Sequence, residues 1–188
     1  MLPPAEFMDP TGWPVPVAIA AIRRMEAIDV ALIEQPVAAG NVGWLVEVRR
    51  AVSTPLMADE SVFTLADAGA LAIAGAVDVL SVYPGKNGGL LRARKIAAVA
   101  EACGLAGHVG SNMELGIASA AMAHLAVATP CLDSERFPAD IIGPLYHEHD
   151  VVTDSGFVRP GRAFAPEGPG LGIELDVAAI QECRLQAD

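Results

Sequence analysis

Residues 77–86 read Val-Asp-Val-Leu-Ser-Val-Tyr-Pro-Gly-Lys, an apolar run followed by a Pro-Gly turn and a lysine. The run is short and rich in Val and Leu, which is typical of a strand buried on both faces of a sheet. Similar runs occur at 31–33 and 55–58, and longer stretches with apolar residues at helical spacing separate them. Strand and helix in alternation predict βα units and a parallel sheet.

Five helices are expected between and after these strands. The third opens at Thr64, and Asp67 three residues later is typical of a capping box. The first carries Ala18, Ile22, Met25 and Ile28 on one face, the second covers 42–52, the fourth places Ile96, Val99 and Cys103 on one face before Gly104, and the fifth covers 115–128.

Ionisable residues recur at the predicted strand ends. They are Asp9, Glu34, Asp59, Lys86 and Glu114, at intervals of 25, 25, 27 and 28 residues. One βα unit of a (β/α)8 barrel occupies about 30 residues, and such barrels hold their chemistry at the carboxyl ends of the strands. The interval therefore predicts an α/β fold, part of a TIM-type barrel, with these side chains facing one mouth.

Three of these residues are acids that could bind one hard divalent cation. Mg²⁺ prefers carboxylate oxygens, so Asp9, Glu34 and Asp59 are candidate ligands. The alternative is that the acids only cap helices or sit in loops, since Ser61 and Thr64 nearby could also act as caps.

Lys86 and Glu114 are the candidate catalytic residues. Only two of the twelve basic residues are lysines, Lys86 and Lys95. A lysine at a barrel mouth can become a base when burial lowers its pKa, whereas Lys95 is expected to be a solvated helix residue. Glu114 could contact substrate or relay a proton, or it could only favour the dipole of the following helix.

The remaining histidines and cysteines are interpreted as structural. His108 is expected to be a core histidine, Cys103 a core residue, and His147 and His149 surface residues. Three cysteines in 188 residues, without a Cys-x-x-Cys motif, predict neither a disulfide scaffold nor a zinc site. No Gly-x-Ser-x-Gly, Gly-x-Gly-x-x-Gly or phosphate-loop motif occurs.

The composition and net charge exclude some classes of binding partner. A net charge of −11 argues against nucleic acid and anionic membranes, and 53% hydrophobic residues argue against a disordered chain. The longest uncharged run, 115–132, is broken by polar residues and Pro130, which favours a buried helix over a membrane span. The first ten residues lack the features of a signal peptide, so we expect a cytoplasmic protein.

Four motifs in order resemble the enolase superfamily, in particular its mandelate racemase/muconate lactonizing branch and the muconate cycloisomerase-like subgroup. They are Ile33-Glu34-Gln35-Pro36, Ala58-Asp59-Glu60-Ser61, Lys86-Asn87-Gly88-Gly89 and Gly110-Ser111-Asn112-Met113-Glu114. The stretches 140–146 and 168–172 also resemble the C-terminal part of that family.

The resemblance implies roles for these residues. Glu34 and Asp59, with Asp9 as the first ligand, would bind Mg²⁺ (or Mn²⁺), and the metal would bind the carboxylate of a small-molecule substrate. Lys86 would remove the α-proton as the acid/base, Glu114 would be a further active-site acid, and the metal would stabilise the enediolate. Near Asp9 the family motif differs, because Thr11 stands where the family usually has Asn.

The resemblance also implies missing parts. We expect a partial barrel of about strands 3 to 8 over residues 1–145 and an irregular C-terminal segment over 146–188 that packs back on it. The family's N-terminal capping domain and its Lys-x-Lys motif have no counterpart in the chain. We therefore expect a homo-oligomer, or association with the missing N-terminal part, because open strand edges favour pairing.

Three alternative functions stay open. The chain could be a non-catalytic remnant that keeps part of the metal site. It could be an acid-sugar dehydratase or racemase of the same superfamily, because these reactions share the first proton abstraction. It could also be a barrel aldolase in which Lys86 forms a Schiff base.

Overall fold

The computed structural model describes residues 12–183, which form an α/β structure built on a four-stranded parallel sheet. The strands are β1 (Ile33–Glu34), β2 (Leu56–Ala58), β3 (Val79–Ser81) and β4 (Ala106–His108), and they lie in this order in the sheet. Each strand is parallel to the next, with Glu34 opposite Met57 and Ser81 opposite His108. The prediction of a parallel sheet of βα units is confirmed.

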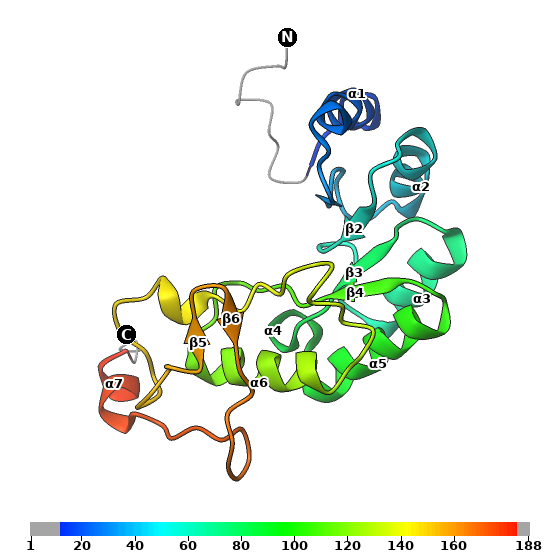
Figure 1. Ribbon diagram of the computed structural model, residues 1–188. Coiled ribbons are helices and arrows are strands. Elements are labelled where there is room, and N and C mark those ends of the chain that lie inside the picture. The colour runs from blue at the N-terminus through cyan, green and yellow to red at the C-terminus, as the bar shows by residue number, and fades with distance from the viewer. Residues whose placement is uncertain (1–11, 184–188) are drawn as a thin grey trace, which may run out of the picture.

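Helices connect the strands and cover one face of the sheet (Figure 1). They are α1 (Val15–Met25), α2 (Val42–Ala51), α3 (Leu65–Ala74), α5 (Leu90–Ala102) and α6 (Gly116–Val127). At the start of α3 the Thr64 side chain accepts from the Asp67 amide, and the Asp67 side chain accepts from the Thr64 amide. The predicted capping box is therefore present.

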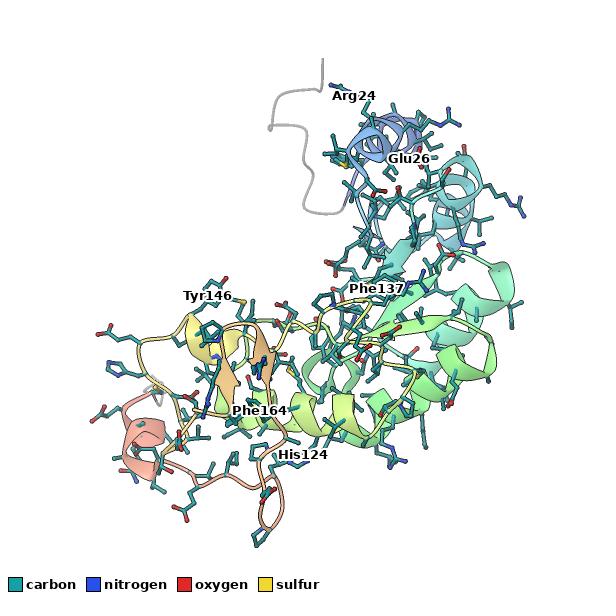
Figure 2. All side chains as sticks on the ribbon, in the orientation of Figure 1. Arg24, Glu26, His124, Phe137, Tyr146 and Phe164 are labelled. Carbon is teal, nitrogen blue, oxygen red and sulfur yellow. The ribbon has the colours of Figure 1, made fainter. Side chains whose placement is uncertain are left out.

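The two faces of the sheet are buried differently. Leu56 and Leu80 point into the main core, which the helices complete. Met57 and Val79 point to the opposite face and pack on Phe137. Figure 2 shows Phe137 on the side of the sheet away from α3 and α5. Because side chains alternate along a strand, the strand-end residues two positions beyond Met57 and Val79 share this second face.

A strand-like stretch after α6 extends the sheet beyond β4. The amide of Gly107 donates to the Cys131 carbonyl, and the Asp133 amide donates back to the Gly107 carbonyl. Further along, the Asp140 amide donates to the Val109 carbonyl. These bonds bring Asp140 to the carboxyl end of the sheet.

The C-terminal part of the chain is irregular and contacts α6. It contains η3 (Gly143–Leu145), the hairpin of β5 (Val158–Arg159) with β6 (Arg162–Ala163), and α7 (Val177–Glu182). The Asp150 carboxylate accepts from the Gly116 amide at the start of α6, at 2.9 and 3.0 Å. His124 on α6 (Figure 2) lies 3.2 Å from the Leu171 carbonyl oxygen. The division of the chain near residue 145 stays a prediction.

Three local expectations were wrong. The first helix changes at Met25 into the 3-10 turn η2 (Glu26–Ile28), whose different pitch rotates Ile28 off the apolar face, so Ile28 is 76% exposed. Cys103 ends α5 beyond the core and is exposed. Lys86, expected directly after a Pro-Gly turn, lies in a short helix, α4 (Pro84–Asn87).

None of the helices within residues 12–183 is long and apolar enough to cross a membrane.

Candidate active site

The predicted site residues lie at the carboxyl ends of the strands. Glu34 is the last residue of β1, and Asp59 directly follows β2. Both line an open cavity of about 530 Å³, together with His108, Ser111 and Asp140. The parallel register places Glu34 opposite Met57, so the two carboxylates face the same side of neighbouring strands. Asp9 lies outside the described residues.

Lys86 is a buried ammonium with a complete set of acceptors. Its Nζ donates to the Asp59 carboxylate at 2.5 Å, to the Asp59 carbonyl oxygen at 2.9 Å and to the Ser81 carbonyl oxygen at 2.9 Å. Its side chain is 2% exposed, and the ammonium lies 4.8 Å from the centre of the Tyr83 ring. A protonated lysine has three N–H donors, and each of them has an acceptor here, so the contacts are those of the protonated amine.

The surroundings of Lys86 act on its pKa in opposite directions. Burial lowers the pKa, because removing water disfavours the ammonium. The hydrogen bond and charge of Asp59, and the charges of Glu60 and Glu34, raise it, and burial is the larger effect. The result is a lysine whose pKa is below its ordinary value although it is ion-paired, and this combination is common at functional sites.

Glu34 lies in a field of negative charge. Burial by the surrounding protein raises its pKa most, and the charges of Asp59, Glu60 and Asp140 raise it further, while Lys86 lowers it. Carboxylates that repel one another at one place favour a bound cation. Mg²⁺ commonly binds through one or two carboxylates and keeps several waters, so Glu34 and Asp59 fit such an ion. Within residues 12–183 no group of three His, Cys, Asp or Glu residues is arranged to hold a metal.

Glu114 lies next to the turn that carries Lys86. Its Oε2 accepts from the Asn112 amide at 2.7 Å, while its Oε1 is buried and has no hydrogen-bond partner among the described residues. A Cβ on Gly85, the residue before Lys86, would lie 2.5 Å from this Oε1. Glycine at position 85 thus leaves the space that the Glu114 carboxylate fills.

The loop that carries Glu114 is held from two sides. Met113 has a positive φ of 62°, and its carbonyl oxygen lies 2.8 Å from His147 Nε2. Gly143 packs so closely on Glu114 that a Cβ would overlap the Glu114 carbonyl. His147 and His149 are exposed, as predicted, but His147 is also part of this contact.

Sequence reasoning missed Asp140 and Ser111 in the cavity wall. Ser111 Oγ donates to the Asp140 carboxylate at 2.7 Å. Asp140 follows Glu114 by 26 residues, so the same interval extended by one step would have found it. Ser111 has no such signal, because a serine in a loop is common.

His108 is only partly the satisfied core histidine that was expected. Its Nε2 lies 3.0 Å from the Pro138 carbonyl oxygen, so this nitrogen carries the proton. The other nitrogen, Nδ1, is buried without a hydrogen-bond partner among the described residues. Burial lowers the pKa of His108, which keeps the ring neutral.

The structure separates the predicted residues into two groups. Glu34 and Asp59 line the cavity, whereas the part of the chain that the structure describes places Lys86 and Glu114 outside its wall. Lys86 reaches the cavity residues through Asp59, and Glu114 packs on Gly85. Lys95 is exposed on α5, as predicted.

The chain is similar to a known family model and to named enzymes. The family described as enolase C-terminal domain-like matches residues 9–179. Muconate cycloisomerase 1 from Rhodococcus opacus is 38% identical over 169 residues, which are 90% of this chain and 44% of that protein. An L-Ala-D/L-Glu epimerase from Bacillus subtilis is 38% identical over 165 residues, which are 86% of this chain and 44% of that protein.

The solved structures that resemble this chain are of the same two kinds of enzyme. The crystal structure of 2-chloromuconate cycloisomerase from Rhodococcus opacus superposes with a TM-score of 0.87 at 36% identity, over 93% of this chain and 46% of that one. The substrate-liganded epimerase from Bacillus subtilis has a TM-score of 0.78 at 36% identity, over 87% and 45% of the two chains. The chain thus spans less than half the length of the curated relatives it matches.

Proposed function

This chain belongs to the enolase C-terminal domain-like family, and from this premise we propose that it takes part in removing the α-proton of a carboxylate substrate. Its relatives are enzymes named as cycloisomerases and an epimerase. The observation that carries the proposal is the buried ion pair of Lys86 with Asp59 at the strand ends, beside the carboxylate of Glu34. A lysine with a lowered pKa next to a cation-binding pair is suited to this reaction.

The sheet is proposed to be part of a (β/α)8 barrel. Four consecutive parallel strands, with a helix after each, are the repeating pattern of such a barrel. The stretch beside β4 would be the next strand, so that the chain would hold about strands 3 to 8, with the first of them, near Asp9, outside the described residues. The site then lies at the end of the barrel where this fold holds its chemistry.

Lys86 is proposed as the base. As the neutral amine, its Nζ would accept the α-proton and become an ammonium that the Asp59 carboxylate and two carbonyl oxygens already solvate. The same ammonium could return the proton to the substrate carbon. The base must first lose its proton and turn away from Asp59, and burial favours that loss.

Glu34 and Asp59, with Asp9, are proposed to hold Mg²⁺, or Mn²⁺ in its place. When bound, the cation would supply positive charge to the substrate carboxylate and to the enediolate. The Asp59 carboxylate already pairs with one cation, the Lys86 ammonium. Glu114 is proposed as a further acid next to the turn of Lys86.

The reaction is proposed to be cycloisomerase-like, with the epimerase as the second candidate. The two kinds of relative match this chain with the same identity, and both are consistent with an initial proton abstraction. A non-catalytic protein is the main competing function, because Lys86 has all three donors occupied and lies outside the cavity wall formed by the described residues. It would bind Mg²⁺ without exchanging any α-proton.

For partners we propose a small carboxylate substrate and self-association, or association with a polypeptide that supplies the N-terminal part of the family fold. Within the described residues β1 is hydrogen-bonded to a strand on one side only, so its other edge is open to pairing. Nucleic acid and membranes are not proposed as partners, because the net charge is −11. A cytoplasmic location stays a prediction.

Hydrogen–deuterium exchange at the α-carbon tests the proposal. The full chain is incubated in D2O with a panel that includes muconolactone-type lactones, dipeptides and other carboxylates, with Mg²⁺ or with EDTA. Incorporation of deuterium that needs Mg²⁺ supports the proposal. Absence of exchange across the panel, with Mg²⁺ binding retained, would support the non-catalytic protein. Borohydride trapping of a carbonyl substrate on Lys86 in EDTA would favour the aldolase.

The largest expected effect on activity is that of Lys86→Ala. Removing the base should abolish any exchange, a loss of at least about 10²–10⁴-fold. Lys95→Ala is the matched control, because Lys95 is the other lysine of the chain and is exposed. An unchanged rate in Lys86→Ala would show that another group is the base.

A further inference from the structure

Gln35 joins the loop after β1 to the loop after β2. Its Oε1 accepts from the backbone amide of Asp59 at 3.0 Å and from that of Ser61 at 3.1 Å. Its Nε2 donates to the Val37 carbonyl at 2.8 Å and to Ser61 Oγ at 2.9 Å. Both donors and both acceptor positions of the amide are therefore used, and only this orientation of the amide satisfies them all.

The backbone at Gln35 is also unusual. Its φ is +35°, in a region that residues other than glycine rarely adopt. Glycine would be the natural residue for such a backbone, but glycine has no side chain to reach Asp59 and Ser61. The Gln35 amide donates to the Met57 carbonyl, so main chain and side chain both attach this residue to the neighbouring strand.

These contacts lie between two residues of the proposed site. Glu34 directly precedes Gln35 in the chain, and Asp59 receives the Gln35 side chain at its backbone amide. Asp59 in turn holds Lys86 through its carboxylate and its carbonyl oxygen. A continuous path of hydrogen bonds thus leads from Gln35 through Asp59 to the Lys86 ammonium.

We propose that Gln35 is a positioning residue that sets the spacing of the Glu34 and Asp59 carboxylates and, through Asp59, keeps Lys86 in its buried place. This inference rests on the proposed function for its meaning in catalysis and extends it to a residue that touches no reacting atom. Residues that orient metal ligands typically change metal affinity about 10- to 100-fold when they are replaced.

The test uses Gln35→Leu, which keeps the size of the side chain and removes its four hydrogen bonds. Gln181→Leu is the matched control, because Gln181 is exposed on α7. Mn²⁺ affinity, measured by electron paramagnetic resonance on the full chain, should fall about 10- to 100-fold in Gln35→Leu and stay unchanged in the control. Urea unfolding of both variants shows that the affinity is measured on folded protein.

A second measurement needs neither metal nor substrate. Brief reductive methylation with formaldehyde labels accessible amines, and the two lysines give an internal ratio. In the wild-type chain Lys95 should be labelled and Lys86, at 2% exposure of its side chain, protected. In Gln35→Leu the labelling of Lys86 relative to Lys95 should rise at least several-fold, because Asp59 no longer holds the ammonium in place.

Each outcome decides the inference. A folded Gln35→Leu protein with unchanged Mn²⁺ affinity and a protected Lys86 would overturn it, even if the protein were less stable. Should Gln35→Leu fail to fold, Ser61→Ala, which removes a single acceptor of Gln35, must show a smaller shift in the same direction, and no shift would overturn the inference. If the wild-type chain binds no Mn²⁺, the proposed function fails on its own, while the labelling ratio still decides the link from Gln35 to Lys86.

Discussion

The helix-covered core and the strand-end loops are held together by different forces. In the core, apolar side chains such as Leu45, Leu71 and Leu80 are fully buried and pack without polar partners. In the loops, side-chain amides hold neighbouring segments together. Asn87 accepts from the Tyr83 amide at 2.9 Å and donates to the Val62 and Phe63 carbonyls at 3.1 Å.

This difference means that the core mainly sets the stability of the fold, whereas the loops mainly set where the site side chains lie. Apolar contacts are strong in sum but not directional, so they give a stable sheet. Hydrogen bonds contribute only about 1 kcal/mol each in net terms, but they fix distances and angles. Substitutions in the core should therefore change stability, and those in the loops should change binding and catalysis.

The largest effect on stability is expected from Leu80→Ala. Leu80 lies in the main core on β3, so its truncation should lower the free energy of unfolding by about 2–5 kcal/mol through lost burial and a residual cavity. Urea denaturation measures this value. The control is Ile73→Ala on α3, which is 90% exposed and should cost less than about 0.5 kcal/mol. Equal losses in the two variants would contradict this division between core and surface.

Mg²⁺ bound at the strand-end loops should raise the stability of the whole fold, the core included. If Glu34 and Asp59 bind the ion, Mg²⁺ at about 100 times its dissociation constant should raise the free energy of unfolding by about 2.7 kcal/mol. Glu34→Gln should lose most of this gain. Without metal, Glu34→Gln should be slightly more stable than the wild type at pH values above the raised pKa of Glu34, because the charge of Glu34 then opposes folding. A destabilised, metal-responsive Glu34→Gln protein would contradict the assignment.

Two glycines in helices offer a matched pair. Gly69 lies inside α3 with open space at its missing Cβ, so Gly69→Ala should stabilise the protein by about 0.5–1 kcal/mol. Gly85 lies in the short helix α4, where a Cβ would meet Glu114 Oε1. Gly85→Ala should therefore show no such gain and should lower the exchange rate by moving Glu114.

Thermal unfolding and the α-proton exchange assay compare the two glycine variants. A Gly85→Ala protein that gained as much stability as Gly69→Ala and kept full activity would show that the packing of Glu114 on the turn is unimportant.

The last comparison concerns the response of the fold to acid. Burial lowers the pKa of His108 in the folded chain, so the unfolded chain binds more protons as the pH falls below its ordinary pKa of about 6.5. The stability that comes from keeping His108 neutral is complete above about pH 6.5. It is lost as the pH falls through the lower pKa that His108 has in the folded chain. His108→Gln keeps a donor for the Pro138 carbonyl and cannot be protonated.

The His108→Gln protein should lose less stability than the wild type between about pH 7 and pH 5. The expected difference is at most about 1.4 kcal/mol per pH unit, as one proton allows. Urea denaturation at several pH values measures it, and identical pH profiles would show that the ring is not held neutral.

Sequence reasoning located most elements because their signals are local. Residues 42–51, the capping box at Thr64 and the apolar runs before Asp59 and Lys86 carry periodicity and end signals within a few residues. It failed at Ile28, Cys103 and the turn α4, where the helix pitch or the helix end decides exposure. Such ends depend on how the neighbouring segment packs, which no window of the sequence contains.

By itself, the sequence determined that chemistry-bearing residues follow buried strands at one βα unit per step, and the interval from Glu34 through Asp59 and Lys86 shows this directly. Only the tertiary structure decided which of them meet. It placed Lys86 on Asp59 rather than in the cavity wall, put Glu114 against Gly85, and brought Asp140 and Ser111 to the cavity. The physical reason is that spacing along the chain sets the end of the sheet at which a residue lies, whereas contacts between loops from different strands set where its side chain points.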